Sequence, residues 1–139
     1  MKDICQAIYE KLLSVPEIVA LVKDRIYPSI LPEDAPLSAI VYSPINANYD
    51  SALKGDTGYV KQTVQFVCHA SSFKKARELS RLVKATFQDL HGDMCGKYIE
   101  AVFIKSDYEY NGNTSLKFST EEFMSSIEFE FHFNEYKED

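Results

Sequence analysis

The chain has 139 residues, 45% of them apolar and 26% charged, which is typical of one folded domain. Its formal net charge of −6 argues against nucleic acid as a direct partner, because domains that bind nucleic acid usually present a basic surface. No apolar run could span a bilayer, and the N-terminus lacks the pattern of a signal peptide. We therefore expect one soluble domain over residues 1–139, made in the cytoplasm, without a membrane partner.

Two short helices are predicted at the N-terminus. Asp3 can cap a helix that runs to Ser14, because apolar residues recur every four positions from Ile4 onward. Pro16 ends that helix and suits the first turn of a second one, which runs to about Val22 or Lys23.

An extended segment and a strand pair follow. Three closely spaced prolines, Pro28, Pro32 and Pro36, exclude both a helix and a central strand. β-Branched and aromatic residues predict strands over Leu37–Ile45 and Tyr59–Ala70. Turn-forming residues between them predict a long hairpin loop over Asn46–Gly58, mobile in the free chain.

The clearest helix is predicted over Ser72–Leu90. Ser71 or Ser72 can cap its start, and Gly92 stands where a C-terminal glycine is expected. The strand predicted next, Tyr98–Lys105, is apolar on both faces, which indicates a place well inside the sheet.

A polar segment over Asp107–Thr120 predicts a second mobile loop, and a strand follows over Phe123–Asn134. In this strand Ile127 and three phenylalanines alternate with Glu128, Glu130 and His132, which predicts one core face and one solvated face. The fold expected is therefore α+β: a mostly antiparallel four-stranded sheet with the long helix and the two short N-terminal helices packed on one face.

No pattern in the sequence indicates a metal site, a cofactor or a nucleophile. Cys68–His69 and His91–Cys95 are unmatched pairs, whereas zinc sites usually bring two pairs together. The three cysteines, Cys5, Cys68 and Cys95, stand in no nucleophile motif, and their odd number suits a reducing compartment. We expect no bound metal, no cofactor and no catalytic residue.

Two further patterns have simpler explanations than chemistry. The glycine-rich run Gly55–Gly58 lacks the Lys-Ser/Thr of a phosphate-binding loop and reads as a hairpin turn. Glu128 and Glu130 lie about 7 Å apart on one strand face, a spacing that glycosidases use, but a solvated face is the commoner explanation.

The charges are unevenly distributed along the chain. Residues 72–90 contain five basic and two acidic residues, whereas residues 120–139 contain seven acidic residues and one lysine. On the predicted long helix Lys74, Arg77, Arg81 and Lys84 form a stripe opposite the apolar face. The stripe is either a solvated face or a docking surface for an acidic partner, including the acidic strand of a second copy.

Four stretches, taken in order, resemble the small tail-completion (tail-to-head joining) proteins of long-tailed bacteriophages and prophages. They are Val15–Val22 followed by Asp24–Pro28, then Ala35–Leu37 running into Ile40–Tyr42, then Val64–Phe73 leading to Ala76–Leu79, and finally Ser126–Phe131. The likeness spans nearly the whole chain and rests on the order and spacing of these pieces.

The resemblance implies a structural protein without enzyme activity, located in the virion tail or neck and in the host cytoplasm before assembly. It implies a ring, matching the six-fold tail tube, that caps the tube and joins it to head-completion or connector proteins while DNA passes through the lumen without specific binding. We expect partner contacts, with other copies or with neighbouring proteins, from the basic stripe and from the two loops; the loop residues are Asp50, Lys54, Asp56, Asn111 and Asn113.

Two other classes of function remain open from the sequence. A small-ligand-binding or regulatory domain would need an apolar pocket with convergent polar groups. A hydrolase would need a working cysteine or a working pair of glutamates.

Overall fold

The computed structural model describes residues 3–52, 55–111 and 123–135. The helices are α1 (Ile4–Leu13), α2 (Pro16–Val22) and α3 (Phe73–Phe87). The strands are β1 (Ile26–Pro28), β2 (Ala39–Ala52), β3 (Gly55–Ala70), β4 (Gly92–Met94), β5 (Lys97–Ile99), β6 (Ala101–Asn111) and β7 (Phe123–Asn134). In the part of the chain that is described, no helix has the length and hydropathy needed to cross a bilayer.

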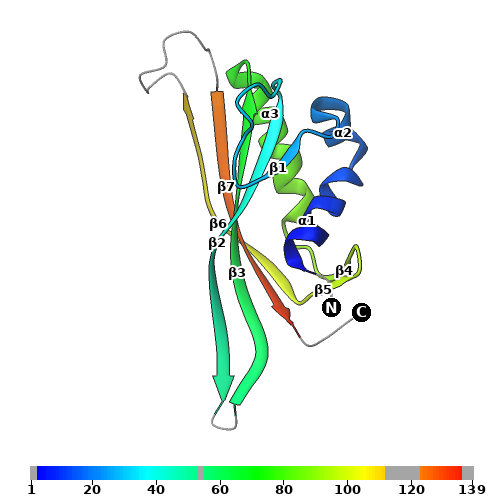
Figure 1. The fold of residues 1–139 in the computed structure, drawn as a ribbon, viewed down its shortest axis with the longest axis vertical. Coiled ribbons are helices and arrows are strands. Elements are labelled where there is room, and N and C mark those ends of the chain that lie inside the picture. The colour runs from blue at the N-terminus through cyan, green and yellow to red at the C-terminus, as the bar shows by residue number, and fades with distance from the viewer. Residues whose placement is uncertain (1–2, 53–54, 112–122, 136–139) are drawn as a thin grey trace.

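Five strands form one twisted sheet in the order β1-β2-β3-β7-β6, and β4 and β5 form a separate small pair. β1 runs parallel to β2, with Ile26 opposite Ile40, whereas the other pairs of the large sheet are antiparallel. The β2–β3 hairpin projects well beyond the rest of the sheet at one end of the molecule, and β6 ends at the other (Figure 1).

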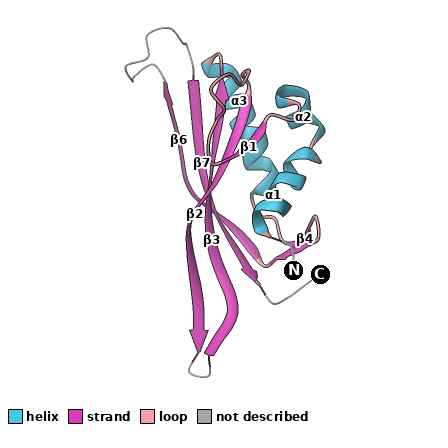
Figure 2. Ribbon diagram, viewed as in Figure 1, coloured by secondary structure: helices cyan, strands magenta, loops and turns pink. Residues whose placement is uncertain are grey.

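The three helices lie on one face of the sheet (Figure 2). α3 packs against β3 and β7, and α2 lies between α3 and β2. At the contact between α3 and the sheet, Phe87 stacks on Phe66 with ring centroids 5.0 Å apart and meets Phe131 edge to face at 5.5 Å. The aromatic cluster is completed by Phe129, 6.0 Å from Phe87. All four rings are fully buried, so this cluster forms the centre of the core.

Several predicted boundaries are confirmed, because each rests on a local chemical signal. The Asp3 carboxylate caps α1 by accepting a hydrogen bond from the Cys5 N–H, and the Ser72 hydroxyl caps α3 by accepting one from the Lys75 N–H. Pro16 occupies the first turn of α2, and β7 has the predicted bounds. The four alternate residues from Ile127 to Phe133 are buried as expected.

The prediction of a four-stranded sheet was wrong. The segment around Pro28 adds a fifth strand, and it pairs in parallel, so the sheet is mixed. Proline is compatible with this position because β1 is an edge strand with a partner on one side only.

The prediction of a long hairpin loop over Asn46–Gly58 was also wrong. Its described residues continue β2 and β3, with Asn46 opposite Thr63 and Ala52 opposite Gly55. Two register shifts, between Pro44 and Asn46 and between Tyr49 and Ser51, absorb residues that do not fit a regular ladder. Turn-forming side chains are tolerated here because several of them, such as Asn46 and Asn48, are exposed and need not fill the core.

The residues predicted to form one strand well inside the sheet, Tyr98–Lys105, instead belong mostly to β5 and to the first half of β6. β6 is an edge strand. Its apolar side chains are partly unburied: Phe103 is 54% exposed, and Ile104 is exposed as well. Residues 107–111 of the second predicted loop belong to β6 instead, and residues 112–120 lie outside the described residues.

α3 also ends earlier than predicted. Its last helical residue is Phe87, and Gly92, with φ of 97°, begins β4 instead of closing the helix. Gln88 at the C-cap is already extended, so Leu90, the last apolar residue of the predicted helical pattern, lies outside the helix.

We predict that Phe66→Ala lowers the free energy of unfolding by about 3–5 kcal/mol, because it opens a cavity where α3 meets the sheet. Phe103→Ala should cost about 1 kcal/mol or less, since Phe103 is largely exposed and loses mainly its ring contact with His132. Urea unfolding of both variants measures the difference. Equal losses would show that the aromatic cluster is not the centre of stability.

Candidate partner-binding surfaces

α3 presents a basic and aromatic hollow on the side away from the core. The hollow has a volume of about 540 Å³ and is lined by Phe73, Lys74, Arg77, Glu78, Arg81 and Leu82.

 The Phe73 ring is 52% exposed, and the Arg77 guanidinium lies over it, 5.9 Å from the ring centroid. The hollow therefore combines an apolar floor with three cations and one carboxylate.

The structure brings together three of the four residues of the predicted basic stripe. Lys74, Arg77 and Arg81 line the α3 hollow, whereas Lys84, one turn further on, does not. The stripe arises because the apolar residues of α3 that face the sheet leave the basic ones on the opposite side.

The predicted loop contacts lie elsewhere. Asp50 and Asp56 belong to the paired strands of the projecting hairpin, and Asn111 ends β6 at the opposite end of the molecule (Figure 1). Lys54 and Asn113 lie outside the described residues. The described loop residues therefore lie at two opposite ends of the molecule.

The sheet face away from the helices carries a hydrogen-bonded network that the sequence did not predict. His132 Nε2 lies 2.7 Å from Glu130 Oε1, and His132 Nδ1 lies 3.0 Å from the Tyr59 hydroxyl. Lys105 Nζ lies 3.6 Å from the other Glu130 oxygen. In the neutral imidazole, Nε2 donates to the Glu130 carboxylate and Nδ1 accepts from the Tyr59 hydroxyl. His132 was predicted to be solvated, but it is only 9% exposed, because Tyr59 and Phe103 pack against its ring.

This network makes Glu130 a poor general acid. Its hydrogen bond to His132 holds the pKa of the carboxyl below its ordinary value, and Lys105 adds to the effect while partial burial opposes it. A glycosidase acid needs the opposite shift, which keeps the proton on the carboxyl near neutral pH.

Cys68 is likewise unsuited to catalysis. Cys68 is fully buried in the core, and burial raises the pKa of its thiol far above the ordinary value. Among the described residues, no three His, Cys, Asp or Glu side chains gather as a metal site would require.

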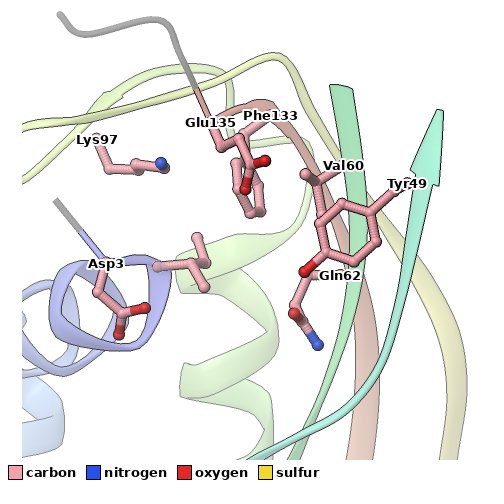
Figure 3. Close-up of a pocket in the computed structure, with 8 residues that line it drawn as sticks. Asp3, Tyr49, Val60, Gln62, Lys97, Phe133 and Glu135 are labelled. Atoms are coloured by element: carbon pink, nitrogen blue, oxygen red, sulfur yellow. The ribbon is translucent and has the colours of Figure 1, made fainter. Parts of the chain in front are cut away.

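A second hollow, of about 310 Å³, lies between α1, the β2–β3 hairpin and the end of β7 (Figure 3). Lys97 points from β5 towards Phe133, with its ammonium 4.5 Å from the ring centroid, and is only 3% exposed. Asp3 on the rim is engaged as the cap of α1. Sequence reasoning missed this site, because Lys97 stands in no motif and only the tertiary structure brings it to Phe133.

Comparisons with known proteins decide the family. A family model described as "Tail completion protein gp17" matches residues 6–119. The chain belongs to this family. It is thus a structural protein of phage-type virion tails, in agreement with the resemblance drawn from the sequence.

A solved structure titled "Virion of native gene transfer agent (GTA) particle" contains a chain of similar fold. The two chains are 12% identical, with a TM-score of 0.69, and the match covers 98% of this tail-completion protein and 95% of that chain. At this identity the likeness concerns the fold alone. No curated protein matches the chain.

We predict that the Glu130 network makes stability depend on pH. Because the pKa of Glu130 is lowered in the folded state, its contribution is complete above the unfolded pKa, about 4.3, and is lost as the pH falls through the folded pKa. Glu130→Gln should lower the free energy of unfolding by about 1 kcal/mol at pH 7 and by less at pH 3.

Glu128→Gln is the matched control, since Glu128 lies on the same strand face but is not part of this network. Denaturant unfolding from pH 3 to pH 7 measures both variants. A Glu130→Gln profile parallel to that of the parent protein would contradict the role given to the network.

Proposed function

We propose that this tail-completion protein caps the tail tube and joins it to the head-completion or connector proteins as a hexameric ring. Membership of the tail-completion family is the observation that carries the proposal. The place proposed for it is the neck of the particle, with the host cytoplasm as its location before assembly. Its partners are other copies of itself, the tail-tube protein and the head-completion protein.

The surface chemistry supports an assembly role. The α3 hollow offers an exposed aromatic ring beside three cations, and aromatic residues and arginine are the side chains enriched at protein–protein contacts. We propose that this basic surface meets acidic residues of an adjacent subunit or of the next protein in the tail.

The overall charge supports passage of DNA without binding. Each Lys or Arg that neutralises a phosphate adds salt-dependent affinity for nucleic acid, and a formal net charge of −6 opposes such binding. A subunit of this charge suits a ring whose lumen DNA crosses without specific contacts.

We also propose that the protein is not an enzyme. The buried Cys68 and the lowered pKa of Glu130 both argue against the hydrolase alternative. Asp3, Gln62 and Lys97, polar groups at the hollow in Figure 3, are engaged within the chain, which argues against a small-ligand site.

Deletion of the gene should leave DNA-filled heads and unjoined tails, because the proposed joint would be missing. Electron microscopy of lysates measures the ratio of joined to free structures, and purified protein added to the deletion lysate should restore joining. Normal numbers of joined particles without the protein would refute the proposal.

A further inference from the structure

A short segment beside the edge strand β1 presents one exposed isoleucine on a constrained backbone. Ile30 is 73% exposed, although it lies between Pro28 and Pro32. The Ile30 N–H donates to the Pro28 carbonyl at 2.7 Å, and the Ser29 N–H donates to the Tyr42 carbonyl at 2.9 Å. The turn places Ser29 at φ of 67°, a conformation that non-glycine residues seldom adopt. Ile30 is therefore held outward with little conformational freedom to lose on binding.

The same segment is acidic. Glu33 and Asp34 are exposed, and residues 29–38 contain no Lys or Arg. In the described part of the C-terminal region, by contrast, Glu130 already binds His132 and Lys105. Residues 29–38 are thus a better acidic counterpart for a basic surface than the strand β7.

The α3 hollow has the complementary features. Phe73 and Leu82 supply apolar lining, and Lys74, Arg77 and Arg81 supply positive charge. An apolar side chain flanked by two carboxylates fits such a site, because burial of the side chain and attraction between the charges act together.

The two surfaces do not meet within one chain. Among the described residues, only residues of α3 line the α3 hollow, and Ile30 stays exposed. The acidic segment adjoins β1, at one edge of the sheet, whereas α3 packs over β3 and β7 nearer the other edge.

We propose that Ile30 of one copy inserts into the α3 hollow of a second copy, with Glu33 and Asp34 facing Lys74, Arg77 and Arg81. This inference rests on the proposed ring and names its contact between subunits. Because the two surfaces differ, the contact is heterologous and can repeat from one copy to the next around a closed ring.

The test is complementation of a strain that lacks the gene. Ile30→Glu, Glu33→Lys with Asp34→Lys, and Arg77→Glu with Arg81→Glu should each lower the yield of joined particles about tenfold or more. The variant that combines both charge reversals should recover most of the yield, because opposite charges face each other again. A combined variant no better than the separate reversals would overturn the proposal.

Two controls separate binding from folding. Ile30→Leu keeps an apolar side chain and should complement like the parent protein. Thermal melting of each purified variant should stay within a few degrees of the parent, because the substitutions are at surface positions. A variant that melts much lower is replaced by Ile30→Ser, which removes the apolar side chain without adding charge.

The outcomes also separate this inference from the proposed function. If the deletion strain joins heads to tails normally, the proposed function fails. If it does not, yet Ile30→Glu and the arginine reversals complement fully, the function stands and the contact is refuted.

The purified chain gives a second readout. At high concentration, Ile30→Cys with Leu82→Cys should form disulfide-linked oligomers under mild oxidation, whereas Ala20→Cys with Leu82→Cys should not. Equal cross-linking of the two pairs would overturn the proposed contact.

Discussion

The packing of Phe87 against Phe66, Phe129 and Phe131 is the interaction on which the rest of the structure depends. It attaches α3 to the two central antiparallel strands, β3 and β7. Once this face of the helix is buried, the amphipathic pattern leaves the basic residues on the outer side. The position of the α3 hollow is thus a consequence of the aromatic core.

Most ionisable groups that could suggest chemistry are used in the architecture. Glu130, His132 and Tyr59 form a hydrogen-bonded network on the open sheet face, and Lys97 lies over Phe133. Cys68 is a core residue. What remains for function is the surface, where exposed apolar side chains such as Ile30, Phe73 and Phe103 stand beside charged ones.

The β2–β3 hairpin projects beyond the rest of the sheet, and β6 is an edge strand of the described sheet. A two-stranded ribbon is only marginally stable by itself, and an exposed edge strand is normally protected by charges or covered by a partner. Phe103 on that edge is largely exposed. Both features suit the assembly role proposed above.

The sequence by itself determined the elements whose signals are local. Asp3 and Ser72 predicted helix starts, because a capping side chain acts within three residues, and the alternation from Ile127 to Phe133 predicted β7 with its buried face. The basic stripe followed from helical periodicity in the same way. The order of weak motifs was enough to indicate the family.

Only the tertiary structure decided which strands are neighbours and which side chains become exposed. β6 is apolar on both faces but lies at an edge, and Asn46–Gly58 is rich in turn residues but its described residues form paired strands, because pairing depends on distant partners. The meeting of His132 with Tyr59, 73 residues apart, and the outward position of Ile30 were likewise invisible in the sequence. Local patterns report the preference of a segment, whereas neighbours in space determine its burial.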